Sequence, residues 1–302
     1  MSSASITVTL SIIYGFPSVF LYILTIIIIQ KNKKKFDSSF FNLYVFDGFM
    51  NMFTYLNVLF TSRLSSVTCD TCLLAPVYRN VGRFISLNFV LAMLYHMAYV
   101  QYSITVLVSL NRLSVLLKSH VFEPIWKKYT WLFIILIYFL PFLNTKIVFY
   151  YETEITYFDD IDQYSLISRE LPVTQIFSIL IPFMILAMSL TIFFNIASVI
   201  FLRGLNIQRK QTESKFLLIT IITCGFQLVG TIISVPLSLL EVSPVLMKLS
   251  LILPFTSDGL SLVQPWLLLC FSAAVSAIFE ETYLEILKRN QKVVNYKNVL
   301  LV

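Results

Sequence analysis

Seven long apolar runs dominate the sequence, and each is long enough to cross a membrane as a helix. A membrane-spanning helix needs about 20 mainly apolar residues, because it rises about 1.5 Å per residue through a hydrocarbon core of about 30 Å. Apolar residues make up 58% of the chain and charged residues only 13%, which excludes an ordinary soluble domain and a disordered chain. We interpret these runs as spans at residues 6–29, 40–61, 84–110, 129–151, 173–202, 216–240 and 249–279.

The second and seventh runs contain polar residues, among them Asp47 and Asp258, but both are counted as spans. Omitting either one would leave a connecting loop too long and too apolar for water. The first run follows no basic residue and exceeds the apolar part of a signal peptide, so it is interpreted as an uncleaved helix. We therefore predict an all-α membrane protein in which residues 1–302 form a single seven-helix bundle domain.

The Lys and Arg residues indicate how this bundle is oriented, because cytoplasmic segments of membrane proteins are enriched in them. With the N-terminus outside, each of the four inner segments contains four Lys or Arg residues, and the outer segments share the other six of the 22. This bias predicts an outer N-terminus and an inner C-terminus. It also argues against a nucleic-acid partner, because the net charge of +6 is spread over four segments that face the lipid bilayer.

The cytoplasmic tail, residues 280–302, begins with a segment that favours a helix. Phe279, Tyr283, Ile286 and Leu287 have the three- and four-residue spacing of one helix face. The segment is interpreted as a short helix on the inner membrane surface, and the alternative is a solvated tail.

Among the ionisable side chains within the predicted spans, the candidates for function are Asp47, His96 and Asp258. Such groups are costly in a membrane, so each is a candidate for a ligand contact or an internal polar contact. For the two acids the alternative is a water-satisfied position near a helix end, and for His96 it is a hydrogen-bonded packing role.

The sequence contains no motif for catalysis or for cofactor or metal binding. HExxH, GxSxG, P-loop and GxGxxG patterns are absent, as is any cluster of His, Cys and acidic residues. We therefore expect no enzymatic activity, no catalytic residue, no cofactor and no metal. Cys69 and Cys72 form a C-x-x-C pair in the first outer loop, where an oxidising compartment allows a disulfide between them.

Prolines interrupt several spans, including Pro182, Pro236 and Pro265. Each removes a backbone hydrogen bond and can kink a membrane helix. Two interpretations stay open: packing geometry alone, or hinges of a conformational switch.

Three short motifs carry a resemblance to a known family. The second span contains F-x-x-x-Y-V-F-D, from Phe40 to Asp47. The third ends in S-L-N-R-L-S-V at 109–115, and the seventh contains S-D-G-L-S-L-V-Q-P-W-L-L-L-C-F-S at 257–272. In this order and spacing, the chain from Ser11 to about Glu285 resembles the nematode serpentine receptors of class gamma, a family of chemosensory receptors of the G-protein-coupled type.

The resemblance implies a plasma-membrane receptor of a sensory cell that binds a small environmental molecule and signals through a heterotrimeric G protein. Asn111 and Arg112 occupy the place of the acidic-Arg-aromatic triplet of rhodopsin-like receptors, so Arg112 is expected to act as a latch and G-protein contact. The acidic and aromatic members of that triplet are missing here. The inner basic residues expected to line the G-protein groove, or to anchor the helices in lipid, are Arg203, Arg209, Lys210 and Lys215.

A transporter or channel is the alternative function. Polar residues such as Asn51, Gln101 and Asn195 could form part of a pathway through the bundle. The sequence shows no inverted repeats and no charge pairs at mid-membrane depth, and both absences favour the receptor.

Overall fold

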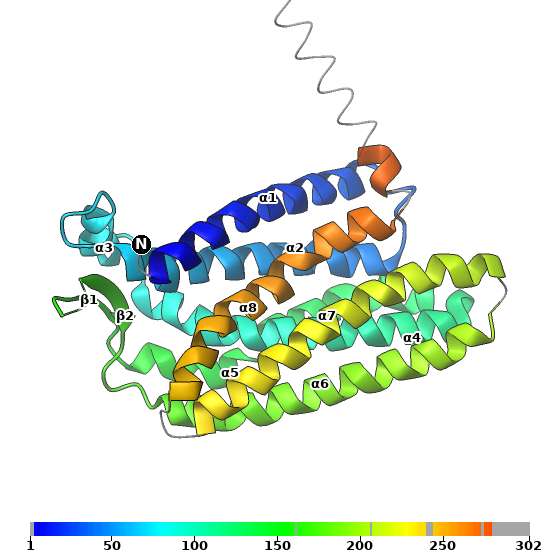
Figure 1. Ribbon diagram of the computed structural model, residues 1–302. Coiled ribbons are helices and arrows are strands. Elements are labelled where there is room, and N and C mark those ends of the chain that lie inside the picture. The colour runs from blue at the N-terminus through cyan, green and yellow to red at the C-terminus, as the bar shows by residue number, and fades with distance from the viewer. Residues whose placement is uncertain (1–2, 161, 206, 240–243, 273–274, 280–302) are drawn as a thin grey trace, which may run out of the picture.

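The computed structural model describes residues 3–160, 162–205, 207–239, 244–272 and 275–279, and it is mostly helical. Its long helices lie side by side in one elongated bundle (Figure 1). They are α1 (Ser3–Lys31), α2 (Ser39–Val58), α4 (Leu87–Phe139), α6 (Val173–Arg203), α7 (Ile207–Leu239) and α8 (Pro244–Phe271). The short elements are the π-helical turn η1 (Leu59–Leu64), the 3-10 turns η2 (Ser65–Val67), η3 (Val81–Arg83) and η4 (Lys146–Tyr150), the helices α3 (Ala75–Asn80) and α5 (Phe142–Thr145), and the strands β1 (Glu154–Phe158) and β2 (Gln163–Ile167).

α4 is 53 residues long and consists of two helical limbs that meet at Lys118, whose backbone is not helical (φ −147°, ψ 79°). Pro124 lies inside the second limb, so the chain turns before the proline and not at it. The second limb ends at Phe139, where the sequence predicted a helix to residue 151. Pro141 accounts for the early end, because a helix usually stops before a proline. Residues 142–150 then form α5 and η4.

The helices expose apolar side chains on the outside of the bundle, as a lipid-facing surface requires. Four segments are long and apolar enough to cross a membrane among the residues described: Ser5–Lys31, Leu87–Tyr150, Val173–Arg203 and Glu213–Pro236. α2 is more polar, but its polarity faces inward: Asp47 and Asn51 are each 2% exposed, whereas Phe49 is 52% exposed. An inward polar face is the arrangement that a membrane bundle favours.

Two ends of the bundle can be distinguished. The start of α1, α3 and the antiparallel β1–β2 hairpin gather at one end, which we call the hairpin end (Figure 1). The turns from α1 to α2 and from α6 to α7 lie at the opposite end, as do residues 275–279. The predicted tail helix lies outside the described residues. Pro182, Pro236 and Pro265 lie inside α6, α7 and α8, respectively, and each helix continues through its proline.

Candidate functional site

Arg112 is the centre of a cluster that joins three helices at the end opposite the hairpin. Its guanidinium lies 3.8 Å from the ring centre of Phe40 on α2 and 4.3 Å from that of Phe216 on α7. Its Nη1 is 3.6 Å from Oε2 of Glu213, also on α7. Arg112 therefore has both an acidic and an aromatic partner, but they come from other helices. We call these four residues the Arg112 latch.

Asn111 has a structural role in this conformation, because it is buried and cannot touch a partner protein. Its Nδ2 donates to Ser39 Oγ at 2.8 Å, and Ser39 donates to Glu123 from its backbone nitrogen (2.6 Å) and from its hydroxyl (2.9 Å). The chain links both limbs of α4 to the start of α2. The role in G-protein coupling that the resemblance implies for Asn111 and Arg112 stays a prediction.

The predicted basic residues lie at the same end of the bundle. Arg203 ends α6 and is exposed, and Lys215 is exposed on the first turns of α7. The side chains of Arg209 and Lys210 lie outside the described part of the chain. Arg112 is thus buried among its partners, while Arg203 and Lys215 are exposed on the surface of the bundle.

Asp47 belongs to a polar network in the bundle core. Asn51 Nδ2 donates to Asp47 Oδ1 at 3.0 Å, and Gln101 Nε2 donates to Asn51 Oδ1 at 2.9 Å and to Ser261 Oγ at 2.8 Å. Asp47 and Gln264 also line a small cavity of about 20 Å³, the size of one water molecule. The network connects α2, α4 and α8, so Asp47 has an internal polar contact and does not line the larger cavity described below.

Asp258 forms a buried ion pair with Arg63. Arg63 Nη2 lies 2.6 Å from Asp258 Oδ2, and the side chains are only 3% and 4% exposed. Arg63 also donates to Ser11, and Tyr14 donates to Asp258, so α1 takes part in the pair. Charge pattern alone placed Arg63 in an outer loop, but the π-helical turn η1 extends α2 and brings it inside. A pair of this kind requires both charges, because either one alone would be buried uncompensated.

His96 packs between the first limb of α4 and α5. Its Nδ1 lies 3.3 Å from Thr145 Oγ1, and its ring centre is 4.1 Å from that of Phe142. The residue is fully buried and lies apart from both acids. The structure thus places it in the hydrogen-bonded packing role that the sequence left open.

A cavity of about 330 Å³ lies in the half of the bundle near the hairpin end, between α2, α4, α6, α7 and α8. Its volume is at the small end of the range for ligand sites, about 300–1,000 Å³. Gln101 connects the cavity to the Asp47 network. Tyr102, beside it, has its hydroxyl 2.8 Å from Thr231 Oγ1 on α7. The lining residues are Val58, Ser62, Leu94, Ala98, Gln101, Tyr102, Met184, Phe226, Gly230, Ser234, Leu253, Thr256, Ser257 and Leu260.

None of these lining residues is charged, so Asp47, His96 and Asp258 do not line the cavity. The sequence search for ionisable groups therefore did not lead to this site. Gln101 was considered only as part of a transport pathway, and its neighbour Tyr102 was not singled out among the polar residues of the span.

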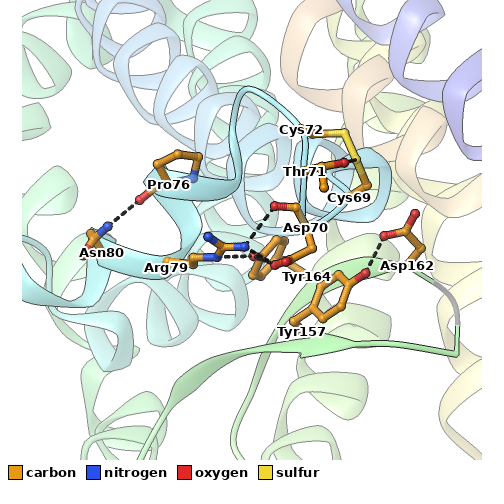
Figure 2. Close-up of polar contacts among 10 residues, drawn as sticks. All are labelled: Cys69, Asp70, Thr71, Cys72, Pro76, Arg79, Asn80, Tyr157, Asp162 and Tyr164. Carbon is orange, nitrogen blue, oxygen red and sulfur yellow. Dashed lines mark hydrogen bonds and ion pairs between the residues drawn. A yellow bond between two sulfur atoms is a disulfide. The ribbon is translucent and has the colours of Figure 1, made fainter.

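The hairpin is tied to the segment between α2 and α4 by a set of exposed polar contacts, which Figure 2 shows. A disulfide joins Cys69 and Cys72. Asp70, between them, pairs with Arg79 and accepts a hydrogen bond from the Tyr164 hydroxyl of β2 at 2.8 Å. Hydrogen bonding to Arg79 and then to Tyr164 holds the pKa of the Asp70 carboxyl below its usual range. We call Asp70, Arg79 and Tyr164 the hairpin clasp.

Aromatic rings extend the clasp toward the bundle. Tyr78 stacks on Tyr164 with ring centres 5.6 Å apart and on Phe60 of η1 at 5.1 Å. On the neighbouring strand, the Tyr157 hydroxyl donates to Asp162, and this bond raises the pKa of Tyr157 to about 12. The hairpin is therefore held near the cavity end of the bundle by packing and by charge.

Apolar outer faces and a polar interior define a multi-pass helical membrane protein. The sequence pattern of the Srg family of chemoreceptors matches residues 8–278, which is most of the chain. The protein therefore belongs to this family. It is also similar to Serpentine receptor class gamma-31 of Caenorhabditis elegans, with 28% identity over 288 residues that cover 90% of this chain and 91% of the relative. The family resemblance predicted from the motifs is confirmed, and the protein is a chemosensory receptor of the serpentine type.

Proposed function

We propose that the chain crosses the membrane seven times, with the hairpin end outside and the Arg112 latch inside. The crossings are α1, α2, the two limbs of α4, α6, α7 and α8. The apolar outer faces of the helices support this proposal, and so does the concentration of Lys and Arg in the segments at the latch end.

Glycosylation mapping tests this orientation. The double substitution Asp160→Asn and Asp162→Thr completes an acceptor sequence in the hairpin, which is expected to gain a glycan in the secretory pathway. Lys34→Ser completes one with Asn32 at the opposite end and is expected to stay unmodified. A glycan at Asn32 would overturn the orientation.

The ligand is a small, largely apolar molecule that binds in the 330 Å³ cavity. Most of the lining is hydrocarbon, and a few hydroxyl and amide groups, including Gln101 and Tyr102, are available to orient one or two polar atoms. The described lining has no charge, so a charged ligand would pay an uncompensated desolvation cost there.

The observation that carries the receptor mechanism is that α4 and α7 each contribute residues to both the cavity and the latch. On α4, Tyr102 lines the cavity and Arg112 follows about 15 Å further along the axis. On α7, Phe226 lines the cavity, and Glu213 lies about 20 Å away. A ligand that binds better when α7 is displaced shifts the population toward the open latch. The inner groove that opens then receives the C-terminal helix of a G-protein α-subunit.

The test is a ligand screen in cells that report G-protein activation, comparing wild type with Arg112→Ala. We expect the ligand response to vanish in Arg112→Ala at equal surface expression, because the arginine released from Glu213 is the proposed contact for the G protein. Lys35→Ala, which alters an exposed base in the turn between α1 and α2 at the same end, is expected to retain the response. A ligand-dependent flux or current without G-protein activation would instead support the transporter or channel.

A further inference from the structure

A groove runs between α6 and α7 on the outer face of the bundle, in the half that holds the Arg112 latch. Its volume is about 390 Å³, and none of its lining residues is shared with the ligand cavity. The two helices are joined at the groove by a hydrogen bond of 2.9 Å from Thr220 Oγ1 to Asn195 Oδ1. The lining residues are Ile192, Asn195, Ile196, Val199, Ile200, Arg203, Ile221 and Cys224.

The groove is apolar along most of its length. Ile196 and Ile200 are 56% and 61% exposed, and Ile221 on α7 is 39% exposed. On α6 the lining residues Ile192, Ile196, Val199 and Ile200 follow three- and four-residue spacing, so they form one continuous face. In a membrane protein this face meets lipid, and its shape suits an extended acyl chain.

One end of the groove is positively charged. Arg203, the last residue of α6, is exposed and lines the groove, and it forms no ion pair with the residues that the structure describes. It lies about 10 Å along the helix from Ile196, so it reaches headgroup depth while the isoleucines stay among the acyl chains. A guanidinium binds phosphate oxygens with paired hydrogen bonds.

We propose that this groove binds an anionic glycerophospholipid, with its phosphate at Arg203 and one acyl chain along Ile196, Ile200 and Ile221. The assignment to the cytoplasmic leaflet, which is rich in anionic lipid, rests on the proposed orientation, but the site itself does not. Ile221 lies about two turns from Glu213 on α7. A lipid that packs better against one position of α7 therefore shifts the equilibrium of the latch.

Lipid titration of the purified full-length protein tests this site. Phosphatidylglycerol and phosphatidylcholine with identical chains are added to the protein in detergent, and native mass spectrometry counts the lipids retained. Wild type is expected to retain phosphatidylglycerol preferentially. In Arg203→Gln, the preference for phosphatidylglycerol over phosphatidylcholine is expected to fall about fivefold. This is the factor typical of one basic residue near a lipid surface. Lys215→Gln, a matched exposed base outside the groove, is expected to keep it.

A second variant separates the effect of the groove's shape from the effect of its positive charge. Ile200→Trp fills the groove without changing charge and is expected to reduce retention of phosphatidylglycerol. Equal losses in Arg203→Gln and Lys215→Gln, or equal retention of the two lipids by wild type, would overturn the site. Because no ligand or G protein is present, failure here is distinct from failure of the proposed receptor mechanism.

Discussion

Arg112 and Glu213 lie 3.6 Å apart at one end of the bundle and join α4 to α7. Phe40 and Phe216 both contact the guanidinium with ring centres 5.1 Å apart, and the arginine side chain is 8% exposed whereas the acid is 18% exposed. The acid is thus the part of the latch that can move. A displacement of α7 removes Glu213 and Phe216 together and leaves Arg112 on Phe40.

Substitution of Glu213 tests this latch. Glu213→Gln removes the charge and keeps the shape, so we expect basal G-protein activation to rise about fivefold, which corresponds to about 1 kcal/mol for a partly exposed ion pair. Basal activation at equal surface expression is the measurement, and Lys35→Gln, which removes an exposed charge in the turn between α1 and α2, is the control. An unchanged basal level would show that the pair does not restrain α7.

The buried pair of Arg63 and Asp258 is expected to control stability and not signalling. Asp258→Asn leaves Arg63 as a buried charge without its counter-ion, which costs about 3–5 kcal/mol. We expect a large fall in the melting temperature of the purified protein.

The double variant Arg63→Gln, Asp258→Asn removes both charges and is expected to recover much of that loss. Asp70→Asn, which breaks an exposed pair, serves as the control and is expected to change the melting temperature little. If the single and double variants melt alike, the two charges are not coupled.

The helices and their inward polar faces could be predicted from the sequence because both follow from local patterns. The runs of apolar residues locate α1, α6 and α7, and the isolated acids Asp47 and Asp258 both proved to be buried. Such features depend on residues that lie within a few turns of one another.

The partners of these residues could not be predicted, because they depend on which helices pack together. Glu213 lies in a basic segment that follows the fifth span, and nothing near Arg112 in the sequence points to it. Arg63 was assigned to an outer loop because its burial depends on the π-helical turn η1, which carries no periodic signal. The break of α4 at Lys118 could not be predicted either, because no proline or glycine marks that position in the sequence.

The hairpin clasp is expected to loosen in acid. The pKa of Asp70 is lower in the folded protein than in the unfolded chain, so its contribution is present above the unfolded value near pH 4 and is lost as the pH falls through the folded value. Hydrogen exchange of the β1–β2 amides, corrected for the intrinsic pH dependence of exchange, measures this loosening.

Asp70→Asn isolates this group from the other acids of the hairpin. The variant is expected to exchange faster than wild type at pH 7, and the difference is expected to shrink below pH 4 and to disappear once the pH lies below the folded pKa of Asp70. Loosening in acid that is as large in Asp70→Asn as in wild type would assign the effect to another carboxylate, such as Glu154, which pairs with Arg169 at 3.2 Å.

A variant that fills the cavity distinguishes an effect on ligand binding from an effect on the Arg112 latch. Ala98 lines the cavity and lies on α4 one turn before Tyr102, so Ala98→Phe places a ring in the space that the ligand would use. We expect the ligand concentration for half-maximal activation to rise at least tenfold, while basal activation and surface expression stay at the wild-type level. Leu190→Phe, which enlarges an outward-facing side chain of α6, is the control and is expected to respond normally. A normal ligand response in Ala98→Phe would place the ligand outside this cavity, whereas loss of basal activation as well would show that the ring disturbs α4 as far as Arg112.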